Sequence, residues 1–500
     1  MTSRKPNEST AKTRILNTDY LHTEGQFTHR ERIPGTPIES PVDMTAVRTT
    51  AVHKIPRTPK NRAMYVLLDD KQSNTLSMHN LVRFPAKLHP PLVVWAIERY
   101  TKPGDTILDP FCGCGTVALE ATLRGRKAIG FDVDPYSAMI AQAKCSPPRQ
   151  ASLRRAIELL ENSLQTLRRK NSVYERLSKG DITLSHFRRQ AKALKLPPIP
   201  NLEHWFKRYV IIDLLRIWNV LRRLPNSKRL TRFLAASFAS ILRLSSNADP
   251  DTLSGLEVTK RMRVWLNMGR YIDPFKIFQT RLTRNLDPIL TTFWAQLKKC
   301  PRPYAPRIRT CSALDGRSYR GTRGKVHTII TSPPYCSAVE YYRRHQLEHY
   351  WLGFIRSAEH GAGIRRKYIG RRDYLYGDVT QLAKLLPEPV REKLYCYLGP
   401  VVYSEKRRIR AIVKYFVDMA KWLGFASEQL RQGGRLVLVV GDSTVRGRPI
   451  RTSELLRELA PRQLRLERTF SYLIRNKSMQ YSRWNAANVA TENVMVFVKR

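Results

Sequence analysis

The sequence is poor in acidic residues and in cysteine. Its 500 residues contain 41 Asp and Glu against 88 Lys and Arg, so the formal net charge is +47. This excess repels itself unless an anion neutralises it, and the phosphates of nucleic acid are the usual partner of so much basic charge. The seven cysteines are too few and too scattered for a disulfide framework, which favours a reducing compartment. We therefore expect a nucleic-acid-binding protein of the cytoplasm, associated with the nucleoid.

Long apolar runs are also absent. The run from Leu436 to Val440 has five residues, and the stretch 209–221 is interrupted by Asp213 and Arg216. A membrane-spanning helix needs about 20 consecutive apolar residues. The first 29 residues are polar and contain no apolar signal-peptide core. We expect no membrane partner and no secretion, while the sequence leaves the oligomeric state open.

Two groups of residues have the composition of metal ligands but not the full pattern. Cys112 and Cys114 form a C-x-C pair, and no second Cys or His pair stands nearby at metal-ligand spacing. His345 and His349 share one helix face, yet the Glu that follows the first His in metalloproteases is missing. We predict that His345, Glu348 and His349 lie on a helix surface, and we predict no metal site.

The pattern of the chain changes three times along its length. Residues 1–75 mix Thr, Arg, Pro and Asn without periodicity, which indicates a basic N-terminal extension. Strand and helix signals alternate in 76–150 and resume in 306–500, whereas 151–305 shows helical periodicity with dense Lys and Arg. We predict one α/β domain in two parts, 76–150 and 306–500, interrupted by a helical insertion at 151–305.

A strand, a glycine turn, a helix and a second strand follow one another in the first part. The first strand ends at Asp109, the turn spans 110–116, and the second strand ends at Asp132, 23 residues after Asp109. Gly113 and Gly115 lack a Cβ, so a ligand can approach the main chain closely. An acid about 20 residues after such a loop suits the hydroxyls of a ribose. No Walker lysine and no G-x-G-x-x-G spacing is present, which predicts a nucleoside cofactor without a pyrophosphate, unless the glycines serve tight packing alone.

A rigid tetrapeptide follows a later strand. Ser332, Pro333, Pro334 and Tyr335 come directly after the strand signal at 326–330. Two successive prolines fix the backbone and remove two amide donors, so the local carbonyls can accept the hydrogens of a planar amino group. The hydroxyl of Ser332 offers a second acceptor, and the Tyr335 ring can stack on the base that carries the amine. A purely structural Pro-Pro-aromatic turn is the alternative interpretation.

The two motifs together resemble those of a known family. Asp109–Thr116 (D-P-F-C-G-C-G-T) and Thr331–Tyr335 (T-S-P-P-Y) are similar to motifs of the S-adenosylmethionine-dependent DNA amino-methyltransferases, which act on N4 of cytosine or N6 of adenine. The resemblance implies a Rossmann-like seven-stranded methyltransferase sheet with a large helical insertion, S-adenosyl-L-methionine as cofactor, and DNA methylation within restriction-modification. It also implies that the insertion at 151–305 serves target recognition. Cys114 replaces the usual Ser of the loop, and Ser312 stands where an acid commonly contacts the adenine, with Asp315 displaced from that position.

The family's residue roles carry over to matching positions of this chain. The resemblance assigns target binding and catalysis to Ser332, Pro333, Pro334 and Tyr335. It assigns cofactor binding to Asp109, Pro110, Phe111, Gly113, Gly115, Thr116 and Asp132. Phe84 and Lys87 join them because 83–90 is similar to the segment that packs beside the cofactor in this family. Glu492 and Lys477 also match the closing pattern of the family.

The resemblance implies methyl transfer by direct displacement to the exocyclic amine of a base in DNA, after the nucleotide has been flipped out of the duplex. Ser332 favours N4 of cytosine, and carbon-5 methylation is disfavoured because the chain has no Pro-Cys dipeptide. The alternatives are an N6-adenine DNA methyltransferase, an RNA enzyme of the tRNA guanine-N2 type, and a non-catalytic nucleic-acid-binding protein. Basic and aromatic residues after the tetrapeptide have the composition of a nucleic-acid groove: Arg343, Arg344, Arg365, Arg366, Arg371 and Arg372, with Tyr341, Tyr342, Tyr368 and Tyr374.

Overall fold

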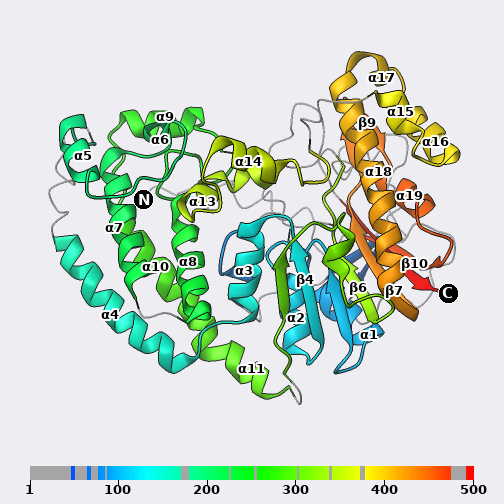
Figure 1. The fold of residues 1–500 in the computed structure, drawn as a ribbon, viewed down its shortest axis with the longest axis horizontal. Coiled ribbons are helices and arrows are strands. Elements are labelled where there is room, and N and C mark those ends of the chain that lie inside the picture. The colour runs from blue at the N-terminus through cyan, green and yellow to red at the C-terminus, as the bar shows by residue number, and fades with distance from the viewer. Residues whose placement is uncertain are drawn as a thin grey trace, which may run out of the picture.

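A computed structural model gives the fold of the chain (Figure 1). The residues that the structure describes are 47–50, 65–68, 77–84, 87–169, 180–224, 227–252, 256–300, 303–336, 341–371, 378–473 and 491–500. Of the positions assigned above, Lys477, Arg372 and Tyr374 lie outside these ranges.

A mostly parallel sheet of nine strands runs through the molecule, in the order β1-β2-β10-β11-β7-β6-β3-β4-β5. Its core strands are β10 (Leu464–Leu473), β11 (Thr491–Lys499), β7 (Leu430–Val440), β6 (Val326–Thr331), β3 (Thr106–Asp109), β4 (Lys127–Asp132) and β5 (Arg307–Thr310). In this core, β11 is antiparallel to both neighbours, β10 and β7, and every other pair is parallel. The predicted α/β fold with a seven-stranded sheet is confirmed. The short strands β1 (Val47–Thr50) and β2 (Tyr65–Leu68) extend it beyond β10.

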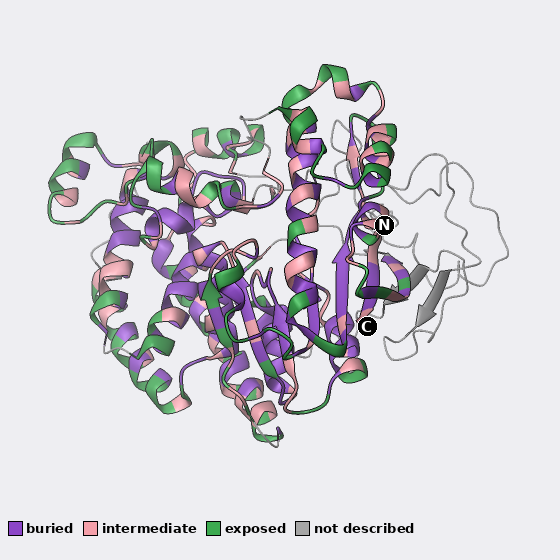
Figure 2. Cartoon of the chain, turned by 45° about the vertical axis from the view of Figure 1, so that its right-hand side comes forward, coloured by how far each residue is buried: buried purple, intermediate pink, exposed green. Residues whose placement is uncertain are grey.

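Helices cover both faces of this sheet (Figure 1). Val437 and Val439 of β7 belong to one core, with α1 (Pro90–Tyr100), α2 (Thr116–Leu123) and α3 (Pro135–Cys145). Leu436 and Leu438 belong to the other core, with α18 (Lys406–Gln429) and α19 (Thr452–Glu458). Successive residues of a strand point to opposite faces, so a strand that is apolar throughout is buried on both. Figure 2 accordingly shows buried strands and helices whose outer faces are exposed.

The predicted large helical insertion follows α3. Its helices are α4 (Gln150–Arg169), α5 (Leu184–Ala191), α6 (Leu202–Trp205), α7 (Arg208–Arg223), α8 (Lys228–Leu242), α9 (Lys260–Asn267), α10 (Pro274–Pro288) and α11 (Trp294–Lys298), with a π-helical turn at Ile289–Phe293 between the last two. Because α8 packs against α3, the insertion and the sheet share one hydrophobic core.

A second group of helices separates β6 from β7. It comprises α12 (Tyr341–Arg344), α13 (Gln346–Trp351), α14 (Ala358–Arg365), α15 (Val379–Ala383), α16 (Glu388–Leu398), α17 (Val401–Ser404) and α18, and a small hairpin of β8 (Ser443–Val445) and β9 (Arg448–Ile450) follows β7. The strand signals at 307–310, 326–330, 435–440 and 493–498 correspond to β5, β6, β7 and β11. Strand β10 was not predicted from the sequence. None of the described helices is long and apolar enough to cross a membrane.

Candidate active site

Two neighbouring strands bring the separated motifs together. Strands β3 and β6 pair in parallel, so Asp109 and Thr331 lie at the same edge of the sheet. The Thr331 hydroxyl donates a hydrogen bond of 2.7 Å to Asp109 Oδ1, across 222 residues of sequence. The glycine loop and the tetrapeptide therefore begin at two residues that are hydrogen-bonded to each other. Both lie at the carboxyl ends of the strands, where open α/β sheets bind ligands.

The glycine loop adopts left-handed backbone conformations. Gly113 has φ +47° and Gly115 has φ +79°. A Cβ on Gly115 would lie 2.7 Å from Ala141 Cβ, which means that this glycine permits close packing of the loop on α3. A Cβ on Gly113 would meet only the Phe84 ring at 3.5 Å. Tight packing thus accounts for Gly115, while Gly113 leaves its amide accessible to a carboxylate, Asp132.

Asp109 and Asp132 are the two carboxyl groups at these strand ends. Asp132 accepts hydrogen bonds from the amides of Gly113 (2.8 Å) and Asp134 (2.9 Å), and Asp109 accepts one from Phe111 (3.2 Å) besides that from Thr331. Among the described residues neither carboxylate forms an ion pair with Lys, Arg or His. Burial raises the pKa of each to about 7, and the negative charge of Asp132 contributes to the rise at Asp109. A ligand with positive charge and hydroxyl donors would relieve this cost.

The other predicted cofactor residues surround this loop. The Phe111 ring packs against Trp422 of α18 at 5.1 Å between centroids, and Pro110 and Thr116 are buried. The Phe84 ring lies beside Gly113 and 4.9 Å from the His345 ring. The Lys87 ammonium donates to the His79 carbonyl at 2.9 Å, an interaction that joins its segment to the 3-10 helix Ser77–Asn80. Phe84 is therefore close to the loop, and the cofactor roles of all these residues remain predictions.

The tetrapeptide forms a hydrogen-bonded chain that ends on a carboxylate. The Ser332 hydroxyl donates to the Tyr335 hydroxyl at 3.4 Å, and Tyr335 donates to Glu492 Oε1 at 2.5 Å. Tyr472 of β10 donates to the other oxygen of Glu492. Burial raises the pKa of Glu492, although the two tyrosine hydrogen bonds oppose this rise. Glu492 matched the family pattern in the sequence, whereas Tyr472 was not predicted because β10 itself was not.

A buried Asp-His-His cluster corrects one prediction. His345, Glu348 and His349 are not on a helix surface, since their exposures are only 3%, 7% and 0%. His345 Nδ1 and His349 Nε2 lie 3.2 and 2.6 Å from the carboxylate of Asp134, which caps α3. Burial alone would raise the pKa of Asp134, but the two histidines outweigh it and hold this pKa well below its usual value. No group of three or more His, Cys, Asp or Glu suited to a metal occurs among the described residues. The one-face spacing of the histidines was visible in the sequence, but their partner, more than 200 residues away, was not.

The residues predicted to line a nucleic-acid groove differ in their exposure to solvent. Arg343, Arg365 and Arg366 are exposed. Arg344 is buried, and its guanidinium donates to the Thr252 carbonyl at 3.1 Å, so it contacts the insertion and not solvent. Asp315, considered for the adenine contact, forms a surface ion pair of 2.9 Å with Arg317.

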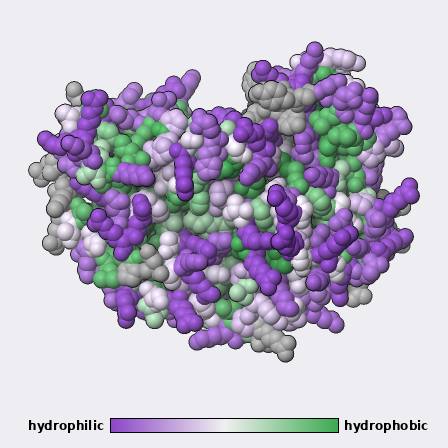
Figure 3. All heavy atoms as spheres, in the orientation of Figure 1, coloured by the Kyte–Doolittle hydropathy of each residue, from purple (hydrophilic) through white to green (hydrophobic). Residues whose placement is uncertain are grey.

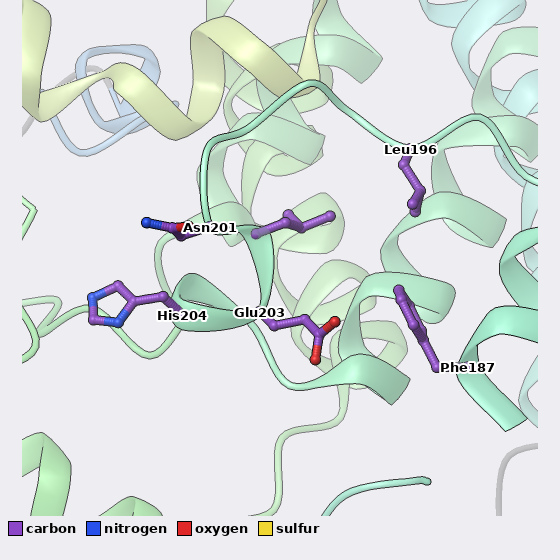
Figure 4. A pocket seen from close by; sticks show the side chains of 6 residues that line it. Phe187, Leu196, Asn201, Glu203 and His204 are labelled. Atoms are coloured by element: carbon purple, nitrogen blue, oxygen red, sulfur yellow. The ribbon is translucent and has the colours of Figure 1, made fainter. Parts of the chain in front are cut away.

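A surface pocket elsewhere on the molecule is separate from these residues (Figure 4). It is lined by Phe187, Leu196, Asn201, Leu202, Glu203 and His204. All six belong to the helical insertion, and none is a residue of the strand ends.

The comparisons with known proteins agree with the motifs. A family model described as "DNA methylase" (N6_N4_Mtase) matches residues 43–143. The type II methyltransferase M.MvaI of Kocuria varians is 23% identical over 389 residues, which cover 76% of this chain and 80% of that protein. The type II methyltransferase M.BsoBI of Geobacillus stearothermophilus is 23% identical over 299 residues, 57% of this chain and 55% of that protein. The solved structure of TrmN from Thermus thermophilus has 11% identity and a TM-score of 0.28 over 86% of this chain and 53% of that one, a similarity too low to carry an argument.

The match to a DNA methylase model and the similarity to type II methyltransferases indicate S-adenosylmethionine as the methyl donor. Over these ranges the chain is similar to DNA methylases and to type II methyltransferases. The residues at the strand ends fit this cofactor. Asp109 and Asp132 have no cationic partner among the described residues, and the cofactor offers them positive charge on its sulfonium and ammonium groups and hydroxyl donors on its ribose.

Proposed function

We propose that this chain methylates the N4 amine of cytosine at a specific sequence in DNA, as the methyltransferase of a restriction-modification system. The observation that carries the proposal is the hydrogen bond between Thr331 and Asp109, because it joins the cofactor loop to the tetrapeptide. The description of the matching family model, DNA methylase, supports DNA as the substrate. Ser332 favours cytosine, and N6 of adenine is the second candidate because both amines suit the same tetrapeptide.

The proposed chemistry depends on the direction of hydrogen bonding at the tetrapeptide. An exocyclic amine is a weak nucleophile because its lone pair is delocalised into the ring. Ser332 donates its hydroxyl hydrogen to Tyr335, which donates to Glu492, so the remaining lone pairs of Ser332 Oγ can accept a hydrogen from the amine. The Pro333 carbonyl would accept the second hydrogen. Both contacts would direct the nitrogen lone pair toward the methyl donor. When bound, S-adenosylmethionine supplies the electrophilic methyl group.

The first experiment identifies the product. Purified protein is incubated with labelled S-adenosylmethionine and plasmid DNA, and the digested nucleosides are analysed by mass spectrometry. We expect N4-methylcytosine. N6-methyladenine would support the second candidate instead, and transfer to tRNA alone, or no transfer to any nucleic acid, would contradict the proposal.

The second experiment tests the tetrapeptide. Ser332→Ala and Tyr335→Ala should lower kcat by roughly 10²-fold or more, because each removes a group that orients the amine. The affinity for S-adenosylmethionine, measured by calorimetry, should stay unchanged. Tyr403→Ala is a matched control, since this tyrosine is 84% exposed and belongs to α17. Equal turnover of all three variants would exclude the proposed role.

A further inference from the structure

Helix α9 of the insertion is anchored to the protein by one face. The Thr259 hydroxyl caps its first turn by accepting a hydrogen bond from the Met262 amide. Met262 is fully buried, and Leu266, one turn later, is half-buried. Residues three or four apart share one face of a helix, so these two side chains define the inner face.

A second face of α9, beside the anchored one, also carries apolar residues. Val264, Trp265 and Met268 have exposures of 55%, 45% and 79%, and with Arg261 they form one face of the helix and of the turn that follows it. We call Val264, Trp265 and Met268 the α9 stripe. A surface helix normally presents polar residues to water, and exposed apolar clusters mark interaction sites. The stripe therefore has the character of a contact surface for a partner.

Charge around the stripe indicates which partner. The segment 260–271 contains four basic residues and no acidic residue. Lys260 and Arg263 are exposed, and the Arg261 guanidinium lies 5.4 Å from the centre of the Trp265 ring. Apolar and aromatic side chains beside cations suit nucleic acid, because the rings contact bases while the cations contact phosphates.

Ion pairs connect α9 to the segment before the cofactor loop. Arg261 Nη2 lies 2.6 Å from Asp249 and 2.8 Å from Asp251. Asp251 in turn lies 3.4 Å from Arg83, which also donates to the Pro250 carbonyl at 2.9 Å. Arg83 directly precedes Phe84, whose ring lies beside Gly113.

The same insertion loop also contacts the segment after the tetrapeptide. The Thr252 carbonyl accepts hydrogen bonds from Arg344 of α12 (3.1 Å) and from Arg243 (2.8 Å). Figure 1 shows α9 on the same upper side of the molecule as α13 and α14, the helices that follow α12. Figure 3 shows hydrophilic side chains over much of the surface seen from this direction and an indentation in its upper outline. Helix α9 thus lies on the same side of the molecule as the helices that follow the tetrapeptide.

We propose that the α9 stripe contacts the bases of duplex DNA and enters the stack when the target nucleotide leaves it. This proposal rests on the proposed function. Flipping a nucleotide costs a few kcal/mol of unstacking, and in some DNA-binding proteins apolar side chains enter between base steps that have come apart. Lys260 and Arg263 add phosphate contacts around the stripe.

The test compares two variants with the wild-type protein on a duplex fragment of plasmid DNA. Trp265→Ala with Met268→Ala should weaken DNA binding by about tenfold or more, because base stacking on an aromatic side chain is lost. The slope of log Kd against log salt should stay unchanged, whereas Arg263→Gln should lower that slope by about one. The affinity for S-adenosylmethionine should be unaffected in both. Leu159→Ala is the matched control, as Leu159 is 46% exposed on α4 of the same insertion.

The outcomes separate this proposal from the proposed function. If the wild-type protein methylates DNA and the double variant binds and methylates it equally well, the role of the stripe is wrong. If the double variant changes only the oligomeric state seen by light scattering, the stripe contacts another copy of the chain and the proposal is overturned. If the wild-type protein transfers no methyl group while the double variant still loses DNA affinity, the proposed function fails and the stripe proposal holds.

Discussion

At the scale of single residues, the ionised forms of two carboxyl groups at the strand ends are disfavoured when no cofactor is bound. Burial raises the pKa of Asp109 and Asp132 to about 7, above the usual value of about 3.9 for Asp. Between these values the folded protein retains protons that the unfolded chain has released. The contribution of these two carboxyl groups to stability without cofactor therefore falls as pH rises through this window and changes little above it.

Cofactor binding should show the opposite dependence on pH. A cationic ligand favours the ionised carboxylates, so the affinity for S-adenosylmethionine should rise between about pH 6 and pH 8. In the wild-type protein the hydrogen bond from Thr331 lowers the pKa of Asp109. Thr331→Val removes this bond, so the pH midpoint of the affinity change should move upward. Calorimetric titrations of both proteins across this range measure the effect. The free cofactor's own titration is the same in both, so coincident midpoints would contradict the assignment.

At the scale of elements, Asp134 connects the turn between β4 and α3 to the helices after the tetrapeptide. Its amide donates to Asp132, and its carboxylate accepts hydrogen bonds from Ser137 (2.6 Å), His345 and His349. One residue thus positions the acid proposed to bind ribose and holds α12 and α13. The cofactor side and the target side of the candidate site share this contact.

Asp134→Ala should cost about 3–5 kcal/mol of unfolding free energy, because it leaves two buried imidazoles without their acceptor. Urea denaturation measures the loss. Asp378→Ala is the matched control: Asp378 also caps a helix, α15, but is exposed, so its removal should cost only about 1 kcal/mol. Similar losses in the two variants would show that capping alone explains Asp134.

At the scale of the whole molecule, the net charge of +47 should dominate DNA binding. Each phosphate contact releases counterions, and six to ten contacts reduce affinity by about 10³ to 10⁵-fold between about 50 and 200 mM salt. We expect a loss in this range for plasmid DNA, measured by fluorescence anisotropy. Affinity for S-adenosylmethionine should change little over the same range and serves as the control. A shallow salt dependence would mean that most basic residues face away from DNA.

The insertion also belongs to the whole-molecule scale, since α8 packs on α3 and both contribute to one core. The sequence predicted its helices from periodicity alone, and its contacts with the sheet domain could not be read from that pattern. The same limit explains why β10 was missed. In β10 (Leu464–Leu473) apolar residues are interspersed with Arg and Glu, which gives a weaker strand signal than the apolar run of β7.

The sequence by itself determined the local features: the strand-turn-helix around Gly113, the rigid carbonyls at Pro333 and Pro334, the helical periodicity of the insertion and the excess of positive charge. These features depend on neighbouring residues or on composition, so they can be predicted from the sequence alone. Only the tertiary structure decided that Thr331 bonds Asp109, that Tyr335 and Tyr472 share Glu492, and that Asp134 holds two histidines. Each of these contacts joins segments that are mostly far apart in sequence. Residue spacing does not show which of these segments become neighbours when the chain folds.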